Sequence, residues 1–178
     1  IPAQPPPPVI RTVEPPQQGE RRVIVRRPGQ VPFIQVVFHA GRANDADVEV
    51  LDLLSTILTG GESSRLYRPL VYDRRVAKDV EATQVSRALG SMFVVQATAA
   101  PGVEVDELAA ELENALRQAL TTPPSDDEME RALNHWRKSF FGMVESTLSR
   151  AQLLSGYHHL LGEADWVARD LQRYTDLK

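Results

Sequence analysis

The sequence contains no cysteine, which excludes disulfide bonds, thiolate nucleophiles and cysteine-rich zinc sites. No apolar run reaches the roughly 18 residues that a membrane-spanning helix needs. The 24 acidic and 20 basic residues leave a formal net charge of -4, so no strong overall field attracts nucleic acid. We therefore expect neither a membrane nor a nucleic acid as a partner. What is present is an ordinary globular balance over 178 residues, enough for one domain with a core.

Recognisable catalytic motifs are also missing. The sequence has no phosphate-binding loop, no G-x-G-x-x-G and no G-x-S-x-G nucleophile turn. Neither H-E-x-x-H nor H-x-x-E-H occurs, and His158 and His159 are neighbours that point about 100° apart on a helix. The other two histidines, His39 and His135, are isolated in the sequence. We therefore expect no metal ion and no cofactor in this chain.

Proline is concentrated at the beginning of the chain, where seven of the 13 prolines lie within Ile1–Pro16. Such a stretch favours polyproline II or disorder. It suits a Pro-rich ligand of an aromatic-lined domain, but a semi-rigid linker is the commoner use of this composition. We predict an interdomain linker over residues 1–19 and a folded domain over residues 20–178. The start at Ile1, without a signal peptide, and the end at Lys178, inside a helical pattern, indicate a piece of a longer protein.

Four stretches rich in β-branched and aromatic residues predict strands: Arg21–Arg27, Val31–His39, Asp79–Val85 and Ser91–Thr98. The arginines of the first stretch could form a nucleic-acid patch. Because no aromatic residues alternate with them, we interpret them as the solvated ends of a strand. The near-continuous apolarity of the second stretch predicts burial on both faces.

The remaining segments predict helices. One follows an N-cap at Asn44 or Asp45 and ends at Gly60 and Gly61, and a short one at Arg65–Arg68 is interrupted by Pro69. The later helices are a leucine-striped one after Gly102, one that begins with a capping box at Ser125–Glu128, and the stretches Thr147–Leu161 and Ala164–Leu177. Because the strands come in adjacent pairs, the order predicts an α+β fold with a largely antiparallel sheet and helices on one face.

At Gly60–Tyr67, the segment G-G-E-S-S-R-L-Y resembles a motif of the second domain of the pitrilysin/insulinase family of zinc metallopeptidases, which includes the mitochondrial processing peptidases. Weaker matches follow in the family's order at Asp79–Ala100, Ser125–Arg131 and Val144–Ser146, and Val31–His39 resembles its opening inner strand. The resemblance spans roughly Val23–Lys178. Each motif is short, and their order and spacing together make the match specific.

The resemblance implies repeated α+β domains that enclose a chamber, in which the first domain binds zinc through H-x-x-E-H and the second binds none. This chain is similar to the second domain. It would be a non-catalytic, chamber-closing and substrate-binding domain of a zinc-dependent metalloendopeptidase, inactive alone. Its implied partners are a peptide substrate and a zinc-bearing domain, in the same parent or in a partner subunit, which would hold the zinc.

In many members the zinc-free domain contacts substrate through an arginine and a tyrosine spaced R-x(6)-Y after the motif. Those positions here are Val71 and Lys78, so both residues are substituted. Lys78 retains a charge that can contact a peptide carbonyl or carboxylate. The family also continues with one more helix and one more strand, so we expect the domain to be truncated at its C-terminus. A sheet edge left unpaired in this way predicts a homodimer of the fragment.

Two other functions remain open. The chain could be a structural or assembly domain of a degenerate, inactive member of the same family, or a stand-alone peptide-binding module that uses its Pro-rich arm. The presence or absence of an H-x-x-E-H motif upstream in the parent would separate the chamber-closing function in a peptidase from the structural or assembly function. The Pro-rich linker and the absence of cysteine favour a bacterial periplasmic protein only weakly.

Overall fold

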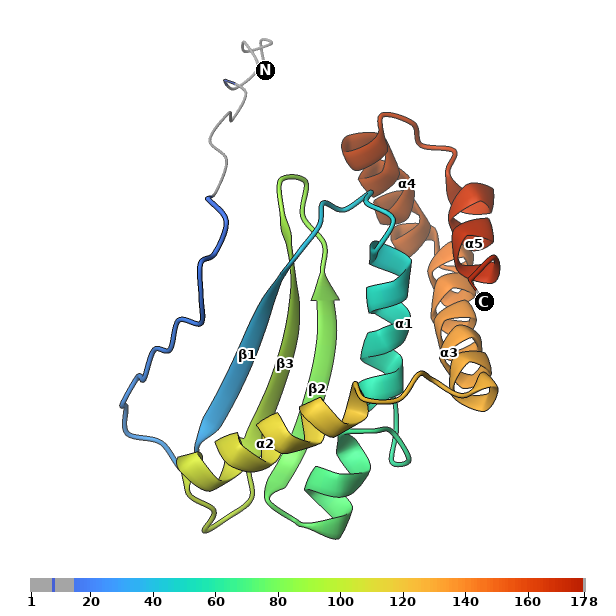
Figure 1. Ribbon diagram of the computed structural model, residues 1–178. Helices are drawn as coiled ribbons and strands as arrows, with labels where there is room; N and C mark the ends of the chain where they lie inside the picture. The colour runs from blue at the N-terminus through green and yellow to red at the C-terminus, as the bar shows by residue number, and fades with distance from the viewer. Residues whose placement is uncertain (1–7, 9–14, 178) are drawn as a thin grey trace.

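A computed structural model describes residue 8 and residues 15–177, which form a three-stranded sheet and a set of helices (Figure 1). The strands are β1 (Phe33–Ala40), β2 (Ala77–Val85) and β3 (Ser91–Ala99). Their order is β1-β3-β2, and both pairs are antiparallel. The α+β fold with a largely antiparallel sheet is therefore confirmed.

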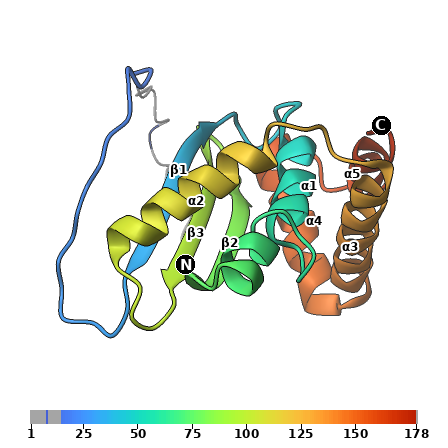
Figure 2. The ribbon, with the colours of Figure 1, turned by 60° about the horizontal axis from the view of Figure 1, so that its bottom comes forward.

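One face of the sheet forms the main core. Its side chains pack against α1 (Val48–Thr59), the π-helical turn η1 (Arg68–Asp73) and α2 (Val105–Ala119). The fully buried members of this core include Leu58, Leu66, Leu70, Val95 and Leu108. In Figures 1 and 2, α2 runs across the sheet and α1 lies along β2. The helices α3 (Asp126–Glu145), α4 (Thr147–Leu161) and α5 (Val167–Thr175) lie beyond α1.

The helix α3 begins as the sequence predicts. The Ser125 hydroxyl accepts a hydrogen bond from the backbone N–H of Glu128, and the Glu128 carboxylate accepts one from the Ser125 N–H. This capping box satisfies amides that would otherwise lack partners in the first turn. The helix ends at Glu145, and Ser146 caps α4 through a bond from the Ser149 N–H. The chain therefore bends at Ser146, between α3 and α4.

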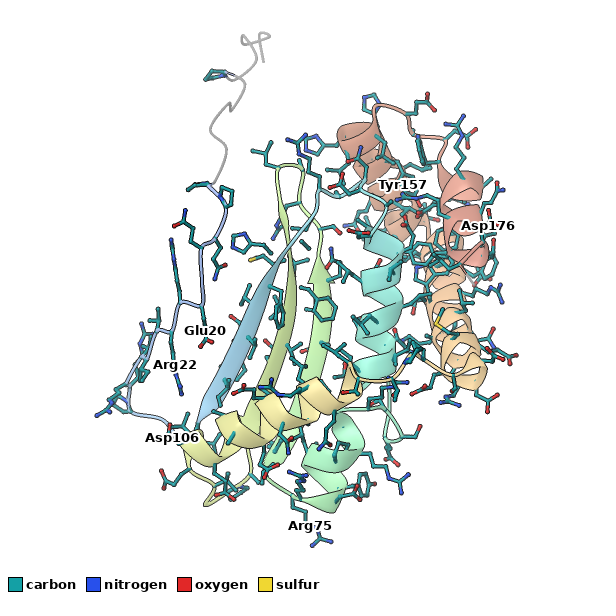
Figure 3. All side chains as sticks on the ribbon, in the orientation of Figure 1. Glu20, Arg22, Arg75, Asp106, Tyr157 and Asp176 are labelled. Carbon is teal, nitrogen blue, oxygen red and sulfur yellow. The ribbon has the colours of Figure 1, made fainter. Side chains whose placement is uncertain are left out.

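The prediction that Arg21–Arg27 forms a strand is wrong. This segment is extended but pairs with no described strand, and Val23, Ile24 and Val25 are 82%, 69% and 67% exposed. A β-branched sequence forms a strand only where a neighbouring strand completes its hydrogen bonds. Arg22 instead lies 3.8 Å from Asp106 at the start of α2, and both side chains are largely exposed (Figure 3).

Two local predictions also need correction. The N-cap of α1 is Asp47, without a side-chain cap, whereas Asp45 accepts a hydrogen bond from the Arg42 N–H. The short helix predicted at Arg65–Arg68 is a π-helical turn that begins at Arg68. Pro69 lies in its first turn, where the missing N–H of proline removes no helical bond.

The predicted linker over residues 1–19 lies mostly outside the described residues, and within it residues 15–19 form neither helix nor strand. No helix of the described part has the length and hydrophobicity to cross a membrane.

Candidate functional site

The face of the sheet opposite the main core is open. No described helix covers it in Figures 1 and 2, and strand alternation directs every second side chain of β1, β2 and β3 onto it. Its central rows pair across all three strands as Gln35–Gln96–Glu81 and Val37–Val94–Thr83. Because Val37 is 42% exposed and Met92 is 40% exposed, this face offers apolar surface to solvent. The prediction that the apolar run Val31–His39 is buried on both faces is therefore wrong, since no described helix covers this face of β1.

A polar ladder crosses the middle of this open face. The Gln35 amide donates to the Gln96 side-chain oxygen at 3.3 Å, and the Gln96 amide donates to Glu81 at 2.8 Å. The three side chains come from three different strands, so the ladder fixes their orientation across the sheet. The open face therefore combines an ordered row of polar groups with neighbouring apolar side chains.

A β-bulge directs Lys78 away from the core. Ala77 pairs with Ala99, and Asp79 pairs with Thr98, so β2 uses one more residue than β3 and Lys78 is the extra one. Without the bulge, strict alternation counted back from the buried Val80 would turn Lys78 toward the core and Ala77 away from it. The outcome is that Ala77 is buried while Lys78 and Asp79 are exposed. Bulges commonly re-aim a side chain in this way beside functional sites.

Val71, the other position at which the family residue is substituted, is less exposed than Lys78. Val71 lies on η1, is half-buried and packs against the main core. The structure therefore exposes Lys78 and not Val71. Arg75, which follows η1, has a left-handed φ of 57°, and its side chain points away from the molecule in Figure 3.

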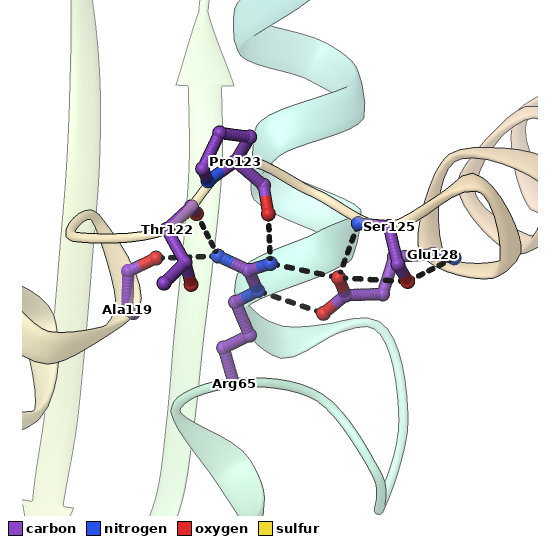
Figure 4. A network of polar contacts seen from close by, with 6 residues as sticks. All are labelled: Arg65, Ala119, Thr122, Pro123, Ser125 and Glu128. Carbon is purple, nitrogen blue, oxygen red and sulfur yellow. Dashed lines mark hydrogen bonds and ion pairs between the residues drawn. The ribbon is translucent and has the colours of Figure 1, made fainter.

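Arg65, the arginine of the G-G-E-S-S-R-L-Y motif, forms hydrogen bonds within the fold. The Arg65 guanidinium donates to the backbone carbonyls of Ala119, Thr122 and Pro123, at 2.6, 2.7 and 2.9 Å (Figure 4). It also donates two bonds of 2.7 Å to the Glu128 carboxylate. All five donors of the guanidinium are thus used, and they connect the segment between α1 and η1 to the end of α2, the α2–α3 loop and the first turn of α3.

This network controls the ionisation of Glu128. The hydrogen bonds from Arg65 lower the pKa of Glu128 to about 2, and the bonds at Ser125 act in the same direction. The carboxylate in turn raises the pKa of Arg65. Both groups stay charged at neutral pH, and neither is free to take part in proton transfer. The sequence identified the motif and the capping box but not the contact between them.

A second polar cluster joins α1 to α4 and α5. The Tyr174 hydroxyl donates to Asp52, the Tyr157 hydroxyl donates to Asp170 at 2.5 Å, and Arg173 pairs with the buried Glu49. Burial is the main cause that raises the pKa of Asp52, and it also raises the pKa of Tyr174. Sequence reasoning missed this cluster, because nothing in the local pattern connects Asp52 to Tyr174.

An open cleft of about 610 Å³ lies beside this cluster, between the α1 N-terminus, the end of α4 and α5. Its two arginines already have partners in the protein. Arg169 pairs with Glu163 and stacks over the Trp166 ring at 5.2 Å, and Arg173 pairs with Glu49. The cleft therefore offers no unpaired cation to a ligand.

The described residues do not fit a zinc ion. No group of three or more histidine and acidic side chains among them lies close enough to hold a metal. The histidines are spread over β1, α3 and α4, and a zinc site needs several ligands that converge on one point.

The comparisons decide the family. The model of the peptidase M16 inactive domain matches residues 1–135. This chain belongs to the peptidase M16 inactive-domain family. The zinc protease PqqE of Helicobacter pylori is 25% identical over 164 residues, which cover 92% of this chain and 35% of that protein. This M16 inactive domain therefore spans about a third of the length of that curated relative.

Solved structures agree with the family. The inactive peptidase domain of a candidate zinc protease from Bordetella parapertussis superposes with a TM-score of 0.76 at 26% identity, covering 88% of this chain and 84% of that one. A candidate zinc protease from Bordetella pertussis Tohama I gives 0.75 at 26% identity, covering 85% and 83%. The resemblance to zinc-free domains of bacterial metallopeptidases is thus confirmed. These comparisons do not test the roles of Lys78 and Val71, which remain predictions.

Proposed function

We propose that this chain closes the peptide-holding chamber of a zinc metalloendopeptidase and contacts the peptide through the open face of its sheet. The observation that carries the proposal is the contrast between the two faces. One face is buried under α1, η1 and α2, whereas the other presents the Gln35–Gln96–Glu81 ladder and exposed apolar side chains. A surface of ordered polar groups beside apolar ones suits an extended peptide, which has both main-chain polar groups and side chains to bind.

Lys78 is the residue that we assign to peptide contact. Its β-bulge directs the ammonium group outward at the start of β2, where it can donate to a peptide carbonyl or carboxylate. Val71 packs against the core, and a side chain that reached a peptide from that position would have to be longer than valine. The substrate-binding assignment therefore rests on Lys78, and Val71 supports the turn that precedes β2.

Hydrolysis is assigned to another domain. The zinc ion that activates water would be held by a zinc-bearing domain of the same parent or of a partner subunit, because the described residues do not fit the ion. This chain contributes the wall that excludes water and holds the peptide. The isolated chain is then expected to have no peptidase activity.

The test combines this chain with its parent's zinc-bearing domain and measures chelator-sensitive cleavage of an unstructured peptide. We expect Lys78→Ala to raise KM several-fold while kcat changes little, because a uniform binding contact is lost. Lys138→Ala is the matched control, since Lys138 is an exposed lysine on α3, beyond α1 from the sheet. An unchanged KM in Lys78→Ala would contradict the assignment of Lys78.

The same experiment separates the other functions. A parent without H-x-x-E-H, together with no chelator-sensitive activity in any combination, would replace the peptidase proposal by the structural or assembly one. Tight peptide binding by the isolated chain, lost on removal of residues 1–19, would support the stand-alone binding module.

A further inference from the structure

Arg75 has a backbone conformation that is unusual for its residue type. Its φ is 57°, and no other residue except glycine has a positive φ in the described part of the chain. The Arg74 N–H donates to the Pro69 carbonyl and the Val76 N–H donates to the Leu70 carbonyl, so Arg75 lies in the turn that ends η1. Turns that end helices in this way need a left-handed residue, and glycine is the usual one because it has no Cβ.

An arginine in this turn makes the fold less stable than a glycine would. The left-handed conformation brings the Cβ of an L-residue close to the following carbonyl oxygen, and glycine avoids this contact. The end of η1 needs only the backbone conformation and makes no use of a guanidinium group. Residues held in such conformations cluster at binding sites, where their side chains are used. The side chain of Arg75 therefore needs an explanation outside the turn itself.

The neighbouring arginines have partners within the fold. Arg74 pairs with Glu111 of α2, and Arg68 lies 3.9 Å from Asp73. Among the described residues, no carboxylate lies within ion-pair distance of Arg75, and its side chain points away from the molecule in Figure 3. The Arg75 guanidinium is therefore available to a partner outside the described fold.

The segment around Arg75 is positively charged although the whole chain is not. Residues 68–78 contain four basic residues and one acidic residue, whereas the chain has a formal net charge of -4. Two of the four basic residues form the ion pairs just described, which leaves Arg75 and Lys78. Three residues of chain span at most about 11 Å, and both side chains are long, so the two cations can contact one peptide.

We propose that Arg75 binds a carboxylate of the peptide that Lys78 contacts, so that the domain favours peptides with an acidic side chain or a free C-terminus near the start of β2. The inference rests on the proposed function, because it needs a peptide on this wall of the chamber. A guanidinium group holds a carboxylate through two parallel N–H···O bonds, which an ammonium group cannot form. Arg75 thus selects the carboxylate, whereas Lys78 adds a contact that a carbonyl can also satisfy.

The test uses this chain with its parent's zinc-bearing domain and an unstructured peptide that has one glutamate and a free C-terminus. Arg75→Gly removes the guanidinium and keeps the turn, because glycine readily adopts a positive φ. We expect KM to rise roughly three- to tenfold with little change in kcat. The rise should shrink at high salt, since Arg75 is exposed. Arg150→Ala, at an exposed arginine of α4, is the control and should leave KM unchanged.

Stability separates a binding role from a structural one. Arg75→Gly should raise the urea midpoint, because it relieves the left-handed conformation, whereas Arg75→Ala keeps a Cβ and should not raise it. Both variants should raise KM equally, because both lack the guanidinium. A chain that becomes more stable while it binds the peptide less well supports the inference. A lower midpoint in Arg75→Gly than in the unchanged chain would show that Arg75 serves the fold and would overturn the inference.

Peptide variants identify which carboxylate is bound. Amidation of the C-terminus removes one carboxylate, and replacement of the peptide's glutamate by glutamine removes the other. The change that abolishes the KM difference between Arg75→Gly and the unchanged chain identifies the bound group. A difference that persists in a peptide with both changes would refute carboxylate recognition.

The same measurements distinguish a failure of this inference from a failure of the proposed function. If Lys78→Ala raises KM while both Arg75 variants leave it unchanged, the assignment of Arg75 is wrong and the proposed function stands. If no combination of domains cleaves the peptide in a chelator-sensitive way, the proposed function is wrong, and this inference is wrong with it.

Discussion

Replacing Arg65 with lysine should destabilise the fold strongly although the charge is kept. The Arg65 guanidinium makes five hydrogen bonds to four residues, and its side chain is only 16% exposed. A lysine ammonium has one nitrogen and three donors, so it cannot reach acceptors on opposite sides of the guanidinium. At least two charge-assisted bonds to partly buried acceptors are lost, which predicts a decrease of about 3 kcal/mol in the free energy of unfolding at pH 7.

Urea denaturation followed by circular dichroism measures this difference, and the chain provides its own control. Arg117 pairs with Glu113 at 2.6 Å, but the two side chains are 74% and 72% exposed. Arg117→Lys should therefore change the free energy of unfolding by less than about 0.5 kcal/mol. If Arg65→Lys were equally mild, the network in Figure 4 would not stabilise the fold, and the structural role of the motif would be refuted.

The pH dependence gives a second, independent signature of the same network. The pKa of Glu128 is about 2 in the folded chain against an ordinary 4.5, mainly because of the bonds from Arg65. A lowered folded pKa contributes stability that is complete above the unfolded pKa and lost as the pH falls from about 5 toward 2. The difference between the folded and unfolded pKa values corresponds to at most about 3 kcal/mol in the free energy of unfolding. Arg65→Lys should flatten this loss, which a simple packing defect would not do.

Three further outcomes are expected. Ser125→Ala removes the capping hydroxyl of α3 and should lower the free energy of unfolding by about 1 kcal/mol in urea denaturation. Asp52→Asn should stabilise the fold at pH 7 by up to about 1 kcal/mol but not at pH 3. Burial raises the pKa of Asp52 because it penalises only the ionised carboxylate. Equal effects on the free energy of unfolding at both pH values would contradict this explanation. Elemental analysis of chain purified without a histidine tag should find no stoichiometric zinc.

The fold could be predicted from the sequence where the signal is local. The leucine stripe of α2, the capping box of α3 and the paired strands β2 and β3 each depend on neighbouring residues, and all are observed. The prediction of a strand at Arg21–Arg27 was wrong because a strand needs a neighbouring strand, which its own sequence does not supply. The π-helical turn η1 could not be predicted, because Pro69 is compatible with the first turn of several kinds of helix.

The candidate site was less predictable, because its decisive features join residues that are distant in the sequence. The spacing after the motif pointed to Val71 and Lys78 alike. Only the register of β2 against β3 shows that a bulge exposes Lys78, and only the packing of η1 shows that Val71 faces the core. The contact of Tyr174 with Asp52 links α5 to α1 and has no signature in either helix alone.

The environment of Arg65 explains this difference between fold and site. The motif that made the family recognisable contains Arg65, whose donors all bond to Ala119, Thr122, Pro123 and Glu128. The residue therefore holds the α2–α3 loop against the segment between α1 and η1. A motif with that role reports how the chain folds, and it is compatible with a domain that has no catalytic groups. The resemblance therefore transferred the architecture reliably, whereas activity has to be argued from the open face of the sheet and from Lys78.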